Sequence, residues 1–311
     1  MNGLEIQIKD LNLVLSGNEI LEDINLTVKA GEIHCLVGPN GGGKTSLFEF
    51  FDEVIKKHEW QDVTYIEPYA GGAGAAISLL LLEKVRNIVI NDYDPAIYSF
   101  WLSLKEYNAE FIKRVVDTPV TVEEWERQKK VYKAADTSDR LSLGFATFFL
   151  NRTNRSGILN AGPIGGKQQL GEWKIDARYN KQNLIEKIKL IGLYGDRITV
   201  LNDDGVDVIE RYVKDPKSFF YVDPPYFVKG ADLYLNAFKL RNHRKLAASL
   251  NKYNNAKWLL SYDNEKDILD LYSDRKYRTF DLKYSAHHNS KVGSELMIFS
   301  DSIDMGIIDE A

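Results

Sequence analysis

Apolar and polar residues alternate along the start of the chain, and the pattern changes after a glycine-rich segment. Apolar residues recur at short, regular intervals in residues 4–15 and 20–28, and a Ser-Gly-Asn turn at 16–18 separates the two runs. Alternation of this kind predicts β-strands, and the short connection predicts a hairpin. A short apolar run at 33–37 predicts a third strand, and the stretch 47–57 predicts a helix.

From residue 62 the pattern becomes strand, glycine loop, helix, strand, which is the order of a βαβ unit. Such units predict a parallel sheet covered by helices, so the expected fold class is α/β. Residues 151–181 hold Gly, Asn and Pro with little periodicity and predict loops. Two closing strands are expected to form an antiparallel hairpin at one sheet edge. The expected strands are 63–66, 88–90, 198–201, 219–222, 258–261, 278–284 and 295–300, and the expected helices are 75–84, 97–135 and 242–253.

Composition limits the classes to which the chain can belong. Its 311 residues are 44% hydrophobic and 27% charged, which is typical of a globular protein with a sizeable core. Because the net charge is −5, any contact with nucleic acid must come from a local basic face. The single cysteine, Cys35, allows no internal disulfide and no cysteine-based metal site. The chain has no signal-peptide pattern at its start, no apolar run that could span a bilayer and no metal-ligand spacing among its histidines, so we expect a soluble, cytoplasmic protein without a metal.

A glycine-rich loop, Glu-Pro-Tyr-Ala-Gly-Gly-Ala-Gly at 67–74, connects a predicted strand to a predicted helix. Glycines allow tight turns and close approach of a ligand, and a helix N-terminus favours anionic or hydrogen-bond-accepting groups. About 20 residues further on, the next strand ends at Asp92, where nucleotide-binding βαβ units place a carboxylate on ribose hydroxyls. The spacing differs from a dinucleotide fingerprint, which makes NAD the weaker candidate. A tight turn with a solvated acid is the structural alternative.

The tetrapeptide Asp223-Pro224-Pro225-Tyr226 follows an apolar strand and suits methyl transfer to a planar amino group. The Asp223 carboxylate and the Pro224 carbonyl can accept both hydrogens of an exocyclic amine such as that of adenine. This pulls the nitrogen toward tetrahedral geometry, and the two prolines keep both acceptors aligned. Tyr226 can stack on the base, which must first leave the double helix. The alternative is a rigid turn with a surface acid.

Several short motifs follow one another in a fixed order along residues 42–300, and together they resemble the Dam-like family of DNA adenine methyltransferases. The motifs are Gly-Gly-Lys at 42–44, the loop 67–74, Asp92, Phe-Phe-Leu-Asn-Arg-Thr at 148–153, Arg-Tyr-Asn-Lys at 178–181, Asp-Pro-Pro-Tyr at 223–226, Leu-Ser-Tyr-Asp-Asn at 260–264 and Gly-Ser-Glu-Leu-Met-Ile-Phe at 293–299. An aromatic residue usually precedes the Gly-Gly-Lys segment in this family, whereas this chain has Pro39-Asn40 there.

The resemblance implies a Rossmann-like sheet that binds S-adenosyl-L-methionine and transfers its methyl group to adenine in double-stranded DNA. It also implies that Asp223, Pro224, Pro225 and Tyr226 are catalytic, that the loop 67–74 holds the methionine part, and that Asp203 or Asp204 meets the cofactor adenine. The expected cofactor-binding residues are Asn40, Gly43, Lys44, Glu67, Pro68, Tyr69, Gly71, Gly72, Gly74, Asp92, Asp203, Asp204 and Asp223.

The central region is where this family arrangement places target recognition. Residues 140–181 contain seven basic and two acidic residues, a local net charge of +5 in a chain of net charge −5. Lysine and arginine there can neutralise phosphates and read guanine edges, although a solvated loop is the alternative. The side chains expected to reach DNA are Asn151, Arg152, Asn154, Arg155 and Arg178.

The first residues resemble a different family, the ABC-transporter-type ATPases. Residues 2–46 end in Gly-Pro-Asn-Gly-Gly-Gly-Lys-Thr-Ser at 38–46, a phosphate-binding loop in which backbone N–H groups and a lysine hold phosphates. The chain has neither a Leu-Ser-Gly-Gly-Gln signature nor an apolar strand that ends in Asp-Glu, so ATP hydrolysis is not expected. We interpret the chain as a fusion in which Gly42-Gly43-Lys44 serves the methyltransferase.

The expected organisation is therefore an ABC-ATPase-like β fragment (1–46), a methyltransferase domain (42–300) with a target-recognition insertion (100–190), and a tail (301–311). The alternatives are an inactive DNA-binding protein of the same fold, an ATP-binding module, and methylation of another planar amine such as that of cytosine. A restriction enzyme that acts separately is left open as a partner, no membrane partner is expected, and binding to DNA would place the protein at the nucleoid.

Overall fold

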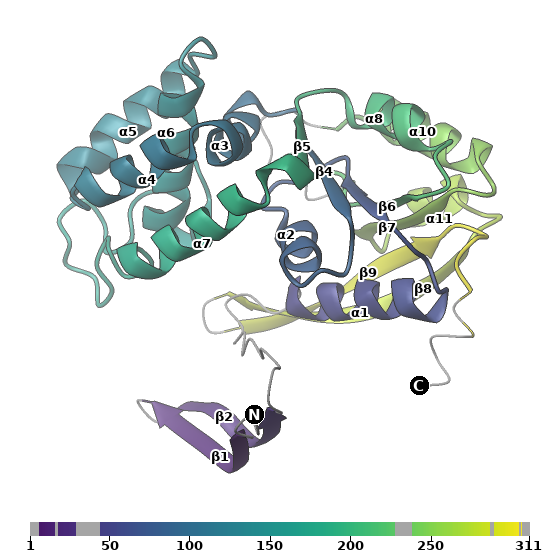
Figure 1. Ribbon diagram of the computed structural model, residues 1–311, viewed down its shortest axis with the longest axis horizontal. Helices are drawn as coiled ribbons and strands as arrows, with labels where there is room; N and C mark the ends of the chain where they lie inside the picture. The colour runs from purple at the N-terminus through teal and green to yellow at the C-terminus, as the bar shows by residue number, and fades with distance from the viewer. Residues whose placement is uncertain are drawn as a thin grey trace, which may run out of the picture. The chain divides into compact units, whose positions relative to one another are not determined.

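The computed structural model describes residues 6–15, 18–28, 44–227, 238–286, 289–304 and 306. The chain divides into two compact units, Met1–Gly41 and Gly42–Ala311 (Figure 1). In the first unit, β1 (Ile6–Leu15) and β2 (Asn18–Val28) pair antiparallel, which confirms the predicted hairpin. The strand expected at 33–37 lies outside the described residues.

The second unit is built on a seven-stranded sheet in the order β5-β4-β3-β6-β7-β9-β8. The first five strands in that order pair in parallel, β9 runs antiparallel to β7, and β8 and β9 form the closing hairpin. The predicted parallel sheet with an antiparallel hairpin at one edge is thus confirmed. The strands are β3 (Thr64–Glu67), β4 (Asn87–Asn91), β5 (Ile198–Leu201), β6 (Ser218–Val222), β7 (Lys257–Asp263), β8 (Lys276–Ala286) and β9 (Asn289–Phe299).

Helices cover both faces of the sheet. The central strands alternate strictly: Tyr65, Phe219 and Leu259 pack into one buried cluster with α1 and α2. Their neighbours Ile66 and Phe220 pack into a second cluster with α8, α10 and α11. Because both faces are buried, these strands appear in the sequence as continuous apolar runs. The helices are α1 (Lys44–Lys57), α2 (Gly74–Leu81), α8 (Gly205–Tyr212), α10 (Leu240–Lys252) and α11 (Lys266–Leu271).

A second group of helices gathers beyond the β5 edge of the sheet, at the left of Figure 1. It overlaps residues 100–190, the range predicted as a recognition insertion, and it contains two helices that were not predicted, at 140–153 and 181–193. At Gly144 of α6 a Cβ would lie 2.4 Å from the Ser99 carbonyl oxygen, so the glycine allows α6 to cross close to α3. The group comprises α3 (Pro95–Glu106), α4 (Asn108–Asp117), α5 (Val122–Ala134), α6 (Arg140–Thr153), the short η1 (Arg155–Gly157), α7 (Lys181–Leu193) and the short η2 (Gly195–Arg197).

None of the helices in the described part of the chain is both long enough and apolar enough to cross a membrane. Among the same residues, no group of three or more His, Cys, Asp or Glu side chains is placed to hold a metal ion.

Candidate active site

The strand order reverses at β3, because the chain continues to β4 on one side and β6 lies on the other. In open parallel sheets, ligands bind outside the carboxyl ends of the strands at such a switch point. The carboxyl ends of β3, β4 and β6 carry Glu67, Asp92 and Asp223, so the sheet brings three of the predicted site residues to one edge.

The glycine loop leaves β3 and turns sharply into α2. Gly71 has φ +48° and Ala73, at the N-cap position, has φ 41°, both in the left-handed region. Ala73 offers no side chain to cap the helix, and the buried carboxylate of Glu67 takes that role by accepting the Ala76 N–H at 3.0 Å. Glu67 therefore links the end of β3 to the first turn of α2 and stabilises the loop between them.

Asp92 braces the same loop from the neighbouring strand. Its Oδ2 accepts the Gly71 N–H at 2.9 Å and its Oδ1 accepts the Asp94 N–H at 2.9 Å. Burial raises the pKa of the Asp92 carboxyl to about 6, although both backbone hydrogen bonds favour the anion. The Trp101 Nε1–H donates to the Gly71 carbonyl at 2.9 Å, so side chains hold Gly71 from two directions.

Asn91, the residue before Asp92, was not predicted as a site residue. Its side chain is fully buried and donates to the carbonyls of Pro68 at 2.8 Å and Asp203 at 3.0 Å. Its Oδ1 accepts the Asp203 N–H at 2.9 Å. One amide thus connects the loops after β3, β4 and β5. The only signal in the sequence was a polar residue at the last position of an apolar strand.

The two acids after β5 have different surroundings. Asp204 caps α8 through Oδ1, which accepts the Val206 N–H at 2.8 Å, and its Oδ2 lies 3.1 Å from the Lys245 Nζ. The carboxylate of Asp203 is 41% exposed and pairs with Arg211 at 2.7 Å. Asp204 therefore caps α8, whereas Asp203 pairs with Arg211, and the contact of one of them with the cofactor adenine stays a prediction.

Tyr69 lies against the start of α8. A Cβ at Gly205 would lie only 2.4 Å from the Tyr69 ring, so this glycine allows the glycine loop and α8 to approach each other. The ring also meets Phe238 edge-on at 5.7 Å. Tyr69 therefore attaches the glycine loop to the second buried cluster.

The loop Asp223–Tyr226 is held by side chains of β7, which pairs with β6, and of β9, the next strand beyond β7. Asp223 is exposed, and its Oδ1 accepts the Ser261 hydroxyl at 2.9 Å. The Tyr226 hydroxyl donates to Glu295 Oε1 at 2.9 Å, and the Phe227 N–H donates to Asp263 Oδ1 at 2.9 Å. Ser261 and Asp263 belong to β7 and Glu295 to β9, and none of the three was predicted as a site residue.

His243 of α10 lies behind this loop. It is buried, its Nδ1 lies 2.7 Å from the Tyr262 hydroxyl, and its ring contacts Phe227 and Phe238. Burial lowers the pKa of His243, so the imidazole stays neutral and acts as a packing residue.

The predicted DNA contact at Asn154 requires a correction. The side chain has no exposed surface, its Oδ1 accepts the Trp125 Nε1–H at 2.6 Å, and its Nδ2 donates to the carbonyls of Ile158 and Leu159. All of its hydrogen-bonding groups are used inside the protein. Asn154 anchors the loop that follows α6, and a base cannot reach it in this structure.

Three arginines remain as the cationic part of the predicted DNA face. Arg155 and Arg178 are exposed and Arg152 is half-buried, and within the described ranges none of them forms an ion pair with an acid. Burial, and then the charge of Arg178, lower the pKa of Arg152. Asn151 donates to the Gly157 carbonyl at 3.0 Å.

The other basic residues of the region have partners within the protein. Lys167 pairs with Glu126 at 3.0 Å, and Lys174 and Lys181 donate to backbone carbonyls. Arg140 stacks on Tyr98 at 5.0 Å. Of the predicted residues near the N-terminus, Asn40 and Gly43 lie outside the described residues, and Lys44 is described only as the first residue of α1.

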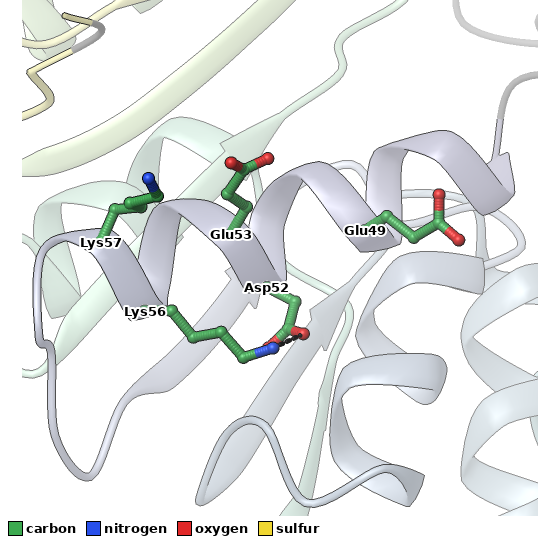
Figure 2. Close-up of a pocket in the computed structure, with 5 residues that line it drawn as sticks. All are labelled: Glu49, Asp52, Glu53, Lys56 and Lys57. Carbon is green, nitrogen blue, oxygen red and sulfur yellow. Dashed lines mark hydrogen bonds and ion pairs between the residues drawn. The ribbon is translucent and has the colours of Figure 1, made fainter. Parts of the chain in front are cut away.

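A hollow of about 380 Å³ lies along α1 and is shown in Figure 2. It is lined by Glu49, Asp52, Glu53, Lys56 and Lys57, and Lys56 pairs with Asp52 at 2.6 Å. All five side chains come from one helix, and none belongs to a strand end. The hollow contains none of the predicted site residues, whereas the carboxyl edge of the sheet carries Glu67, Asp92 and Asp223.

Comparisons with known proteins give a short match and a long one. The probable ATP-dependent transporter ycf16 of Cyanophora paradoxa is 39% identical over 59 residues, which cover 19% of this chain and 21% of that protein. Vegetative protein 296 of Bacillus subtilis is 50% identical over 59 residues, again 19% and 21%. The chain spans 21% to 28% of the length of the first three such relatives. The expected partial resemblance to ATP-dependent transporters is thus confirmed.

Among solved structures, the rRNA methyltransferase aviRa from Streptomyces viridochromogenes has a TM-score of 0.39 and 12% identity, over 89% of this chain and 91% of that one. The long match is to a family model described as D12 class N6 adenine-specific DNA methyltransferase, which covers residues 41–288. That range contains the glycine loop, Asp92, the helices α3 to α7 and the loop 223–226. The chain therefore belongs to the D12 class of N6 adenine-specific DNA methyltransferases.

Proposed function

We propose that this protein transfers the methyl group of S-adenosyl-L-methionine to the exocyclic nitrogen of an adenine flipped out of double-stranded DNA. The observation that carries the proposal is the position of Asp223. It is exposed directly after β6, beside the switch point of the sheet, and its carboxylate accepts a hydrogen bond from Ser261. The family model supports adenine as the base. A DNA substrate would bring the enzyme to the nucleoid.

The residues beside β3 and β4 fit the cofactor. Asp92 offers a carboxylate, the group that accepts ribose hydroxyls in nucleotide-binding βαβ units. A Cβ built on Gly71 would meet no atom within 4 Å, so the loop has space on that side, and Gly72 is exposed. Asp203 offers an exposed carboxylate after β5. When bound, the cofactor supplies an electrophilic methyl group on a sulfonium.

The chain's own residues would prepare the amine for attack. Asp223 accepts a hydrogen bond from one N–H of the adenine amine, and the Pro224 carbonyl accepts a hydrogen bond from the other. The two bonds draw the nitrogen lone pair out of conjugation with the ring. Tyr226 stacks on the flipped base, and its hydroxyl is already held by Glu295, so the ring is oriented before the base arrives. This arrangement lowers the barrier mainly by preorganisation.

Direct identification of the product tests the proposal. The full chain is incubated with labelled S-adenosylmethionine and duplex DNA of varied sequence, and the DNA is digested to nucleosides. We expect the label in N6-methyladenine. Label in cytosine would show a different amine as substrate, and folded protein that binds DNA without transferring label would identify an inactive member of the fold.

The arginine face leads to a prediction about salt dependence. Replacing Arg155 or Arg178 by alanine should weaken DNA binding and reduce the slope of log affinity against log salt by about 0.9 for each phosphate that is no longer neutralised. Fluorescence anisotropy over a salt series measures both. Lys214→Ala removes an exposed positive charge from the loop between α8 and β6, at the opposite edge of the sheet, and should leave the slope unchanged. An unchanged slope in both arginine variants would exclude this face.

Nucleotide binding is a second candidate function, favoured by the similarity to probable ATP-dependent transporters. Asp223 directly follows β6, and Pro224 stands next to it, where a P-loop ATPase would need a second acid. We therefore expect no magnesium-dependent ATP hydrolysis by the purified protein. Turnover that disappears in Lys44→Ala would contradict this expectation, because it would show a working phosphate-binding loop.

A further inference from the structure

Two hydroxyl groups form a chain that ends on Asp223. The Tyr221 Oη lies 3.0 Å from the Ser261 Oγ, and the Ser261 Oγ lies 2.9 Å from the Asp223 Oδ1. Both Tyr221 and Ser261 are buried, at 7% and 6% exposure, whereas Asp223 is exposed. The chain therefore runs from the interior, between β6 and β7, to the edge where the reaction is proposed to occur.

The direction of the hydrogen bonds follows from the number of protons. A serine hydroxyl has one hydrogen, and a carboxylate at neutral pH only accepts, so Ser261 donates to Asp223. The lone pairs of Ser261 are then left for Tyr221, which must be the donor in the first bond. Burial, and then the nearby charge of Asp223, raise the pKa of Tyr221 well above its usual value, so the phenol keeps its proton.

We propose that Tyr221 and Ser261 are positioning residues that hold Asp223 in the orientation needed to accept the adenine amine. The inference rests on the proposed function of Asp223. Prolines at 224 and 225 restrict the backbone after Asp223, but they leave the two side-chain torsions of the aspartate unrestrained. Ser261 restrains those torsions by holding Oδ1, and Tyr221 in turn fixes the rotation of the serine hydroxyl.

The surrounding charges make such a restraint useful. The negative charges of Asp223, Glu67 and Glu295 all act to raise the pKa of Tyr221, so the hydroxyl chain lies among carboxylates. Ser261 and Tyr221 bring hydroxyl dipoles rather than a cation. They orient the carboxylate without neutralising it, and its ability to accept a hydrogen bond from the amine is preserved.

The test is a double-mutant cycle on the full-length enzyme. Ser261→Ala should lower kcat for adenine methylation by about tenfold or more, the size expected for one hydrogen bond to a charged group, with little change in KM for the cofactor. Ser261→Thr keeps the hydroxyl and should recover most of the rate. Tyr221→Phe should lower kcat in the wild-type background but not further in the Ser261→Ala background, because Tyr221 acts through Ser261.

The matched control is Ser300→Ala. The Ser300 Oγ is also buried and accepts the Trp258 N–H of β7 at 3.1 Å, so its loss affects stability without touching Asp223. An unchanged kcat in folded Ser261→Ala, or equal effects of Tyr221→Phe in both backgrounds, would overturn the inference. A wild-type enzyme that transfers no methyl group to adenine would refute the proposed function itself, and this result is distinct from an active enzyme that is indifferent to Ser261.

Discussion

Replacing Asp223 by asparagine is expected to lower the rate of adenine methylation by about a hundred- to a thousandfold. The carboxylate accepts hydrogen bonds only, whereas an amide can turn its NH2 group toward the incoming amine, and two donors cannot bind each other. Removal of one preorganised group aimed at the reacting atoms costs about 10² to 10³ in rate. The fold should persist, because Asp223 is exposed and asparagine has nearly the same size.

Single-turnover transfer of labelled methyl groups to duplex DNA measures this effect without interference from product release. Asp207→Asn is the matched control, since it makes the same change in charge on an exposed acid of α8. A rate for Asp223→Asn within about tenfold of wild type, or roughly 1.4 kcal/mol of barrier, would contradict the assigned role. Circular dichroism of both variants shows whether the fold is retained.

The sheet was predictable because its central strands are buried on both faces. Residues 219–222 form an unbroken apolar run in the sequence. In the structure Phe219 and Tyr221 belong to one buried cluster, and Phe220 and Val222 belong to the other. Such runs, separated by glycine loops and helices, identify a parallel sheet. The strand order then follows from pairings that the sequence does not display, and this order brings β3, β4 and β6 together.

Burial on all sides, which made the strands recognisable, is also the reason why the helix α6 was not predicted. Every residue from Leu143 to Leu150 is buried, so the helix has no polar face and shows no period of 3.6. Periodicity reveals only helices that have one solvent face. Residues 151–181 were expected to be loops, but 151–153 belong to α6, 155–157 form η1 and Lys181 begins α7. The prediction holds for residues 158–180, which lack helices and form only the isolated bridge from Pro163 to Asn154.

The acids of the site were predictable in position, whereas their supports were not. Asp92 and Asp223 each follow an apolar strand, and the carboxyl ends of parallel strands meet at one edge. Ser261 and Asn91 act on these acids or their loops across neighbouring strands, and nothing in the local sequence shows which strands are neighbours. Asn154 was assigned to DNA for a similar reason, because its partner Trp125 lies 29 residues away.

Binding of the cofactor is expected to weaken as the pH falls through about 6, and Asp92 is the group responsible. Burial raises the pKa of its carboxyl to about 6 in the free protein. Ribose hydroxyls donate to the anion, so binding favours the ionised form and must displace a proton at lower pH. Acidification should therefore lower the affinity for the cofactor. The expected decrease between pH 7 and pH 5 is about tenfold for a group that titrates near 6.

Isothermal titration of S-adenosylmethionine into the protein at several pH values measures this dependence. Asp92→Asn should bind about 30- to 100-fold more weakly at pH 7, because two hydrogen bonds to a charged acceptor become bonds to a neutral one. It should also lose the pH dependence, since the amide does not titrate. Asp207→Asn should keep the wild-type profile. If the affinity of the wild type is flat between pH 5 and pH 7, or if Asp92→Asn keeps the slope, another group controls binding. Asp92 would then have a structural role alone, which is to hold the glycine loop by accepting the Gly71 N–H.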